Sequence, residues 1–348
     1  MSGENPVDPE PARDVELDGL AHIAQPEASM AAELEPHLLE GARRHTRDDV
    51  ARLAGVPAER ATALWVALGF PANQDPTAVE FTDADIAALQ LFSAMDFART
   101  ADPRLALSFA RTVGQAMARL AEWQVDVVLN SPTTQTVDQL QWLQSYAWRR
   151  HLAAALARAL ADGAPGGSGL AGSSAGVTGT TTRDLAVGFA DMVSFTRLTR
   201  HLDPGELAAL LEEFEASTTQ AITAHGGWAI KNVGDEVMFA AETPLAAARI
   251  ALAIQAVGLT AGEDRTPVDF RVGVAYGPVL MRFGDLFGSV VNIAARLTGV
   301  ARPGTVLIDD RAADTLTGRS EFDIRHLRSV RVRGFSRLHS HVLRPSRG

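Results

Sequence analysis

The chain has 348 residues, of which 46% are hydrophobic and 21% charged, and its formal net charge is −10. This length accommodates two or three globular domains, and no stretch reaches the ~20 uninterrupted apolar residues of a membrane span. The absence of cysteine excludes disulfides, thiolate metal sites and a cysteine nucleophile. The negative charge argues against broad nucleic-acid binding, and the acidic start does not resemble a signal peptide, so we expect a cytoplasmic protein.

The first 30 residues are predicted to form a disordered acidic leader. They contain several prolines and far more acidic than basic side chains, with little periodicity until about Ala31. A segment of this composition cannot bury enough apolar surface to offset the entropy that folding costs.

Residues 31–161 are predicted to form an all-helical domain. A short helix ends at Gly55 and a second begins at Pro57, which is the outline of a helix-turn-helix. DNA binding would need basic side chains on the second helix, but that helix offers Arg60 alone, beside Glu59. We therefore favour a helical packing unit and expect no nucleic-acid partner.

Three further helices are expected over residues 84–100, 104–129 and 134–161, because apolar side chains recur there at three-to-four spacing. A pocket for a small molecule among these helices stays open as an alternative to simple packing. Residues 162–182 are rich in Gly and Ser, which predicts a flexible linker. A helical half joined in this way to a second domain over 183–348 suits a regulatory role.

The second domain is predicted to be α+β. Its strands and helices alternate in the order βαββαβ, which is a ferredoxin-like core. The expected elements are a strand over 184–191, a helix over 203–225, a hairpin over 228–239, a helix over 244–257 and a strand over 270–276. A helix over 288–298 and outer strands over 305–309 and 330–342 follow.

The hairpin carries an informative lysine. Gly234-Asp235 is a two-residue reversal of the kind that closes hairpins, and Lys231 is the only lysine of the chain. A compact ammonium is not interchangeable with the planar fork of arginine at a tight polar contact. The alternative is that Lys231 has no role and remains by chance in a sequence that otherwise uses arginine. We favour a functional role for it.

Two carboxylates are expected to meet at one edge of this core. Asp191 ends the first strand and Asp235 lies at the hairpin tip, so the βαββ order places them side by side. Two hard oxygen ligands, with backbone carbonyls such as that of Met192 beside them, suit Mg²⁺ bound to a triphosphate. Taken alone, either aspartate is more simply interpreted as a solvated residue at the end of a strand.

A second polar cluster surrounds the helix predicted over 288–298. Asn292 and Arg296 are four residues apart and share a helix face, so they could hold a ribose oxygen and a phosphate. Asp285, expected in the loop before this helix, would accept a hydrogen bond and complement the donor Lys231. Taken alone, Asn292 and Arg296 could be a surface pair.

These motifs, in this order over residues 184–343, resemble the catalytic domain of class III nucleotidyl cyclases. The resemblance implies two Mg²⁺ or Mn²⁺ ions and a head-to-tail homodimer whose protomers share each active site. A Lys and Asp purine pair resembles adenylyl cyclases, which implies conversion of ATP to 3′,5′-cyclic AMP and pyrophosphate. The implied roles are metal binding for Asp191, Met192 and Asp235, purine selection for Lys231 and Asp285, and transition-state stabilisation for Asn292 and Arg296.

The sequence departs from the family at Arg333-Gly334, where a Lys-Gly motif often contacts the triphosphate. Arg333 keeps the charge, and Arg282 is a second candidate for the phosphates. The helical half resembles the regulatory domain of soluble bacterial adenylyl cyclases of the pH-responsive type, which implies a proton or small-molecule effector. Two alternatives stay open: a diguanylate cyclase, and a DNA-binding or ligand-sensing regulator with a degenerate cyclase domain.

Overall fold

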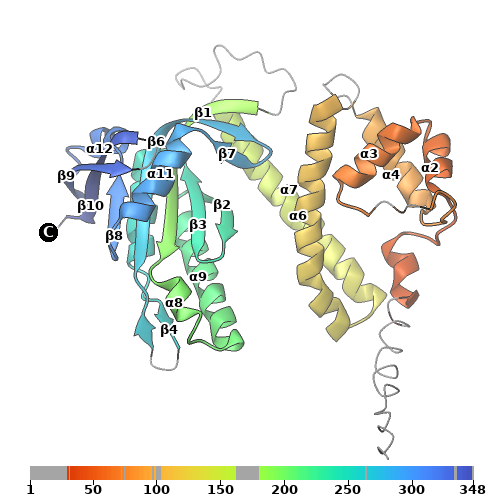
Figure 1. Cartoon of the computed structure of the whole chain (residues 1–348), viewed down its shortest axis with the longest axis horizontal. Helices are drawn as coiled ribbons and strands as arrows, with labels where there is room; N and C mark the ends of the chain where they lie inside the picture. Colours follow the sequence, from red (N-terminus) through yellow and green to blue (C-terminus); the bar gives the residue numbers. More distant parts are fainter. Residues whose placement is uncertain are drawn as a thin grey trace, which may run out of the picture. The chain divides into compact units, whose positions relative to one another are not determined.

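The computed structural model describes residues 30–161 and 180–346, apart from positions 31, 72, 74, 96–97, 99–102, 263–264 and 333–334. The chain divides into two compact units, one on each side of Leu170 (Figure 1). The predicted leader, Arg333 and nearly all of the predicted linker lie outside the described residues. None of the described helices is both long and apolar enough to span a membrane.

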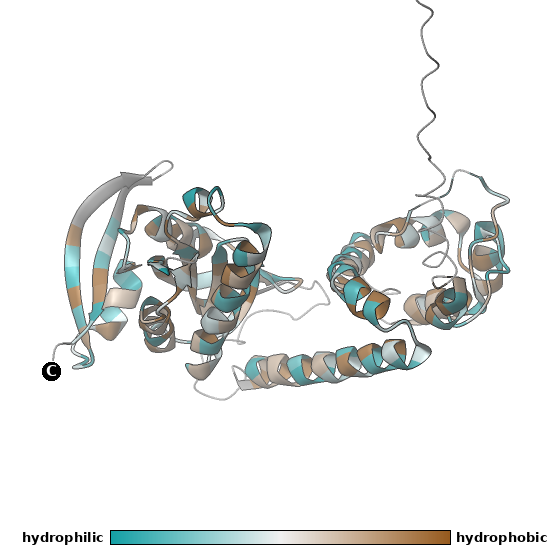
Figure 2. Cartoon of the chain, turned by 90° about the horizontal axis from the view of Figure 1, so that it is seen from below, coloured by the Kyte–Doolittle hydropathy of each residue, from teal (hydrophilic) through white to brown (hydrophobic). Residues whose placement is uncertain are grey.

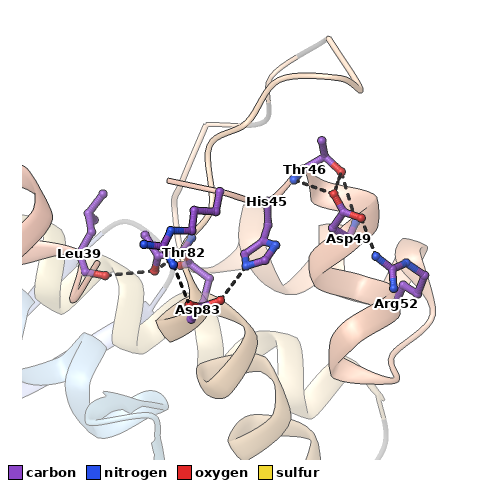
Figure 3. Close-up of polar contacts among 9 residues, drawn as sticks. Leu39, His45, Thr46, Asp49, Arg52, Thr82 and Asp83 are labelled. Atoms are coloured by element: carbon purple, nitrogen blue, oxygen red, sulfur yellow. Dashed lines mark hydrogen bonds and ion pairs between the residues drawn. The ribbon is translucent and has the colours of Figure 1, made fainter. Parts of the chain in front are cut away.

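The first unit is helical, as the sequence predicts. Thr46 begins the first helical pair with a capping box, in which its side chain accepts from the Asp49 amide and the Asp49 side chain accepts from the Thr46 amide (Figure 3). Gly55 ends that helix in the left-handed conformation, with φ 69°. The helices are α2 (Arg47–Ala54), α3 (Ala58–Ala67), α4 (Asp83–Ala94), α6 (Pro103–Asn130) and α7 (Thr134–Ala161).

One predicted boundary in this unit is wrong. The helix expected over 84–100 ends at Ala94, because Met95 adopts an extended conformation with ψ 132°. Apolar residues continue past this point at helical spacing, so periodicity alone does not reveal the break. Figure 2 shows that the helices of this unit carry hydrophobic and hydrophilic residues along their length.

The core of the first unit forms where α3 meets α6. Leu64 and Ala67 pack against Ala110. Gly114 permits this close approach, since a Cβ there would lie 2.1 Å from the carbonyl oxygen of Leu68. A cavity of about 310 Å³, lined mainly by apolar side chains that include Trp65, lies beside this core.

The second unit is built on one sheet in the order β2-β3-β1-β6-β8-β10-β9, with β7 paired to β6 (Figure 1). The central strands are β1 (Thr180–Met192), β2 (Trp228–Val233), β3 (Glu236–Ala241) and β6 (Phe270–Arg282). With α9 (Pro204–Ala224) and α10 (Pro244–Gln255) they confirm the predicted βαββαβ core. The remaining elements are α8 (Phe195–Leu198), β4 (Thr260–Ala261), β5 (Thr266–Pro267), β7 (Asp285–Phe287), α11 (Ser289–Val300), β8 (Thr305–Ile308), α12 (Asp310–Leu316), β9 (Phe322–Val332) and β10 (Phe335–Pro345).

Two expectations for the second unit are wrong. The single outer strand expected over 330–342 is in fact the end of β9 and most of β10, which pair antiparallel. Alternating apolar and arginine residues continue across the reversal and hide it in the sequence. Asp285 lies on the short strand β7, which pairs with β6, and not in a loop. Three residues are too few to show the alternation of side chains that identifies a strand in a sequence.

The sheet is buried on both faces. Successive residues of β1 point to opposite faces, so Ala186 and Met192 pack with α9 and α10, while Leu185 and Val187 pack with α11. Phe214 of α9 stacks on the ring of Phe270 at 5.9 Å. A strand covered on both sides has an almost continuous apolar run, which is the pattern of residues 185–190.

A buried carboxylate links α12 to the sheet. Asp309 caps α12 by accepting from the Ala312 amide at 3.0 Å, and it also accepts from the Tyr276 amide of β6 at 3.2 Å. Burial raises its pKa from 3.8 to about 6, although the two amide donors act in the opposite direction. The native carboxyl therefore holds its proton at pH values where the unfolded chain has lost it.

Asp309 should make the domain less stable as pH rises. Because the folded pKa lies above the unfolded pKa, stability contributed by the protonated form is lost between about pH 4 and pH 6. Asp309→Asn keeps the capping oxygen and removes the titration, so the fall in unfolding free energy across this window should shrink by on the order of 2 kcal/mol. Urea unfolding at several pH values measures it.

Asp203→Asn is the matched control, because Asp203 caps α9 at an exposed position. It should leave the wild-type pH dependence in this window. An equal effect of the two substitutions would show that burial of Asp309 is not the cause.

Candidate active site

The hairpin between β2 and β3 places Asp235 beside the end of β1. Val233 pairs with Glu236, which leaves Gly234-Asp235 as a two-residue loop. Gly234 has φ 62°, and glycine at the first loop position is the pattern of a type II′ turn. The Met192 amide donates to the Asp235 carbonyl oxygen at 3.0 Å and fixes the hairpin tip against β1.

Asp191 lies at the centre of an acidic cluster. It pairs in register with Glu236 of β3 on one side and with Arg271 of β6 on the other. Its carboxylate also forms an ion pair with the Arg271 guanidinium. Burial raises the pKa of Asp191, Arg271 opposes this shift, and the nearby Asp235 adds to it through charge and a hydrogen bond. The structure thus brings Asp191 and Asp235 together.

Glu236 and Arg271 are site residues that the sequence interpretation missed. Burial raises the pKa of Glu236, the charges of Asp191 and Asp235 raise it further, and Lys231 acts in the opposite direction. Both residues occupy ordinary strand positions, so no local signal marks them. They become recognisable only when the register with Asp191 is known.

The cluster suits a divalent cation held jointly with a phosphate ligand. The charge of Asp235 raises the cost of ionising Asp191, a cost that a bound cation would remove. The Met192 side chain is buried in the core, so this residue can offer only its backbone carbonyl. Within the described residues no group of three or more His, Asp or Glu side chains forms a metal cage. Mg²⁺ commonly uses one or two carboxylates with substrate phosphates, so this donor set fits.

Lys231 and Asp285 meet although they are distant in sequence. The Lys231 ammonium contacts Asp285 Oδ2 at 2.7 Å, and Asp285 Oδ1 accepts from the Leu286 amide at 2.9 Å. Phe283 and Gly284 have φ values of 51° and 82°, which is the pattern of a type I′ turn between β6 and β7. Both partners are partly exposed, so a ligand can reach them.

Arg282 lies directly across the same turn from Asp285. Its side chain is exposed, and the guanidinium carbon lies 5.2 Å from the centre of the Phe283 ring. This position leaves the charge accessible to an anionic ligand.

The helix α11 carries Asn292 and Arg296 and is held tightly on the sheet. A Cβ at Gly273 of β6 would lie 2.3 Å from the Thr298 amide nitrogen and 2.5 Å from the Ala294 carbonyl oxygen. The Thr298 hydroxyl donates to the Phe189 carbonyl of β1 at 3.2 Å. The strand β1, which carries Asp191, therefore also fixes the position of α11 on the sheet.

Comparisons with known proteins agree with this arrangement. The family described as "Adenylate and Guanylate cyclase catalytic domain" matches residues 177–345. An adenylate cyclase from Streptomyces coelicolor is 38% identical over 331 residues, which are 90% of this chain and 81% of that protein. An adenylate cyclase from Glutamicibacter nicotianae is 35% identical over 348 residues, which are 94% of this chain and 85% of that protein.

A pH-sensitive adenylate cyclase from Mycobacterium tuberculosis is 38% identical over 141 residues, or 40% of this chain and 34% of that protein. The crystal structure of the adenylyl cyclase CyaB from P. aeruginosa superposes with a TM-score of 0.43 at 23% identity, over 48% of this chain and 97% of that one. The family match over residues 177–345 shows that the second unit is a nucleotide cyclase catalytic domain. The chain belongs to the adenylate and guanylate cyclase family, which sets aside the diguanylate cyclase alternative.

The contact between Gly273 and α11 can be tested by adding one methyl group. Gly273→Ala should lower the free energy of unfolding by about 1–3 kcal/mol, because the new Cβ overlaps helix backbone that cannot rotate away. Gly299→Ala is the control, since a Cβ there meets nothing within 4 Å. Alanine in that helix should be neutral or stabilising by about 0.5–1 kcal/mol. Urea unfolding of both variants measures the difference, and equal stabilities would contradict the packing argument.

Proposed function

We propose that the protein is an adenylyl cyclase that converts ATP to 3′,5′-cyclic AMP and pyrophosphate. The observation that carries the proposal is the 2.7 Å contact between Lys231 and Asp285 beside the acidic hairpin. Adenine offers an acceptor at N1 to the ammonium and an exocyclic amino donor to the carboxylate. Guanine presents the opposite pattern at these two positions and would leave both side chains unpaired.

Asp191 and Asp235, with the Met192 carbonyl, are the residues that would hold two Mg²⁺ or Mn²⁺ ions. Bound ions would lower the pKa of the ribose 3′-hydroxyl and offset the phosphate charge. Arg271, which pairs with Asp191 in this structure, balances part of the acidic charge before the site is loaded. This ion pair reduces the repulsion among the like charges of the cluster.

The reaction needs no covalent enzyme intermediate. The 3′-hydroxyl releases its proton to water and its oxygen attacks the α-phosphorus, forming one P–O bond. The bond from the α-phosphorus to the oxygen that bridges it to the β-phosphate breaks, which releases pyrophosphate. Arg296 is proposed to take up charge on the pentavalent phosphorus, and Asn292 to orient the ribose. Arg282 and Arg333 are proposed to contact the triphosphate.

We propose that the working form is a head-to-tail homodimer. Asp191 and Asp235 of one protomer would face Lys231 and Asp285 of the other. Among the described residues of the second unit, the large apolar side chains that are exposed are Val233 and Phe287. Val233 adjoins the hairpin turn and Phe287 ends β7, so both flank the site residues. Exposed apolar groups at these positions support a subunit interface.

Shared sites predict that two inactive variants complement each other. Asp235→Ala and Lys231→Ala should each lose activity, because one removes a metal ligand and the other removes a purine contact. A mixture should recover up to about a quarter of the wild-type rate, since half of the dimers are mixed and each contains one complete site. The measurement is chromatographic identification of cyclic AMP formed from ATP with Mg²⁺ or Mn²⁺.

Wild-type protein supplied with GTP is the specificity control for this assay. Cyclic GMP as the main product would contradict the proposed substrate, and no cyclic product from either nucleotide would favour the degenerate-domain alternative. No recovery in the mixture, despite subunit exchange shown by mass-tagged chains, would contradict the shared site.

We further propose that the helical unit regulates the cyclase in a pH-linked manner. His37 Nε2 contacts Asp138 of α7 at 2.8 Å, and His45 Nε2 contacts Asp83 of α4 at 2.7 Å (Figure 3). Arg44 also reaches Asp83, at 4.0 Å. Each histidine joins segments that are far apart in sequence, and protonation turns each contact into an ion pair.

Replacing both histidines with glutamine should flatten the dependence of activity on pH between about 5.5 and 8, because glutamine has no charged form and cannot turn either contact into an ion pair. His151→Gln is the control, since His151 is exposed on α7. The initial rate of cyclic AMP formation by the full chain is measured across the window. An unchanged profile in the double variant would show that these contacts are not the sensor.

A further inference from the structure

Three of the chain's nine histidines gather at one place in the second unit. His326 lies on β9, and His339 and His341 lie two residues apart on β10. These two strands end the sheet on one side, whereas the hairpin of β2 and β3 ends it on the other (Figure 1). No step of the proposed reaction uses these histidines, so their grouping needs a separate explanation.

The strand register places two of these histidines directly opposite each other. His326 pairs with His341 in the antiparallel ladder of β9 and β10. Side chains of paired residues leave the sheet on the same face, with Cβ atoms about 4.5–5.5 Å apart. The centres of the two rings are 4.9 Å apart. The backbone of two paired strands therefore holds the rings close together.

This separation suits two nitrogen ligands of one metal ion. An ion about 2.0–2.1 Å from a ring nitrogen lies roughly 3.2 Å from the centre of that ring. Two histidines at bond angles of about 90–110° then have ring centres roughly 4.5–5.3 Å apart. The distance from His326 to His341 falls in this range, whereas the distance of 6.2 Å from His326 to His339 does not. His326 and His341 are therefore the pair that one ion can join.

Asp310 orients His341 for this role. It lies on α12, which packs beside β10, and its Oδ1 is 2.9 Å from His341 Nε2. Its Oδ2 is 3.3 Å from His339 Nδ1. An ionised carboxylate can only accept a hydrogen bond, so His341 Nε2 carries the proton and Nδ1 keeps its lone pair. Histidines that bind metal ions commonly donate their other ring N–H to a carboxylate in this way.

His326 can supply the second ligand by rotation of its ring. Its side chain is exposed, and the planes of the His326 and His341 rings are inclined at 64°. The terminal torsion of histidine is broad, so a His326 nitrogen can turn toward His341 without a change in the backbone. Among the residues that the structure describes, no three His, Asp or Glu side chains are placed to hold one ion together. Water therefore completes the coordination.

We propose that His326 and His341 form a two-histidine binding site for a transition-metal ion such as Zn²⁺ or Cu²⁺, with Asp310 as a positioning residue. Imidazole nitrogen suits these ions, whereas Mg²⁺ prefers oxygen ligands. The ion joins β9 to β10 and, through Asp310, to α12. This site shares no residue with the proposed active site, so each proposal can fail without the other.

Cu²⁺ binding to the full chain tests the proposal. One equivalent of Cu²⁺ is added in the presence of excess Mg²⁺, which binds oxygen donors and competes poorly for imidazole. The electron paramagnetic resonance spectrum should show coupling to two imidazole nitrogens, and carboxylate ligands alone would show none. A spectrum without coupling to two nitrogens would overturn the proposal, even if cyclic AMP is still produced.

His326→Gln distinguishes metal binding from a purely structural role of the cluster. The contact between Asp310 and His341 could hold α12 on the sheet without any ion, but that role does not need His326. His326→Gln should remove one nitrogen from the Cu²⁺ spectrum and weaken Cu²⁺ binding by more than about tenfold, because a ligand is lost. His225→Gln is the control, since His225 is exposed at the end of α9. Equal Cu²⁺ affinities of the two variants would contradict the site.

The positioning role of Asp310 has its own test. Asp310→Asn should keep both nitrogens in the Cu²⁺ spectrum and weaken Cu²⁺ binding by about tenfold, because His341 loses the carboxylate that fixes its proton on Nε2. Urea unfolding without metal shows whether the variant remains folded. An Asp310→Asn chain with wild-type Cu²⁺ affinity would overturn the role of Asp310.

Discussion

The register of three neighbouring strands is the constraint on which the active site depends. Asp191 of β1 lies between Glu236 of β3 and Arg271 of β6, and the Met192 amide is bonded to the Asp235 carbonyl at the hairpin tip. A slip of one residue would turn every side chain of β1 to the other face. The apolar residues on both faces of β1 prevent that slip, because each face packs against different helices. Burial of the core thus fixes the position of the carboxylates that we propose to bind the metal ions.

The same register explains how the acidic cluster remains folded. Three carboxylates share one end of the sheet, and their mutual repulsion opposes folding. Arg271 provides a counter-charge from a rigid strand, and Lys231 lies within electrostatic reach of Glu236. The two cationic side chains have different roles. Arg271 faces the proposed metal site, whereas Lys231 is held by Asp285 on the proposed purine-binding side. Within one protomer, the acidic cluster therefore connects the metal-binding half of one proposed site to the purine-binding half of the other.

The sequence alone predicts most of the long elements, although it misplaces the end of α4. The turn at Gly234-Asp235, the helices α6 and α7 and the βαββαβ order follow from local patterns that tertiary packing does not override. The features that the sequence does not predict have no local pattern that would reveal them. The strand β7 has three residues, the reversal between β9 and β10 is hidden by continued alternation, and Arg271 becomes a site residue only through pairing with a strand 80 positions away. Local signals identify elements, whereas register decides which residues meet.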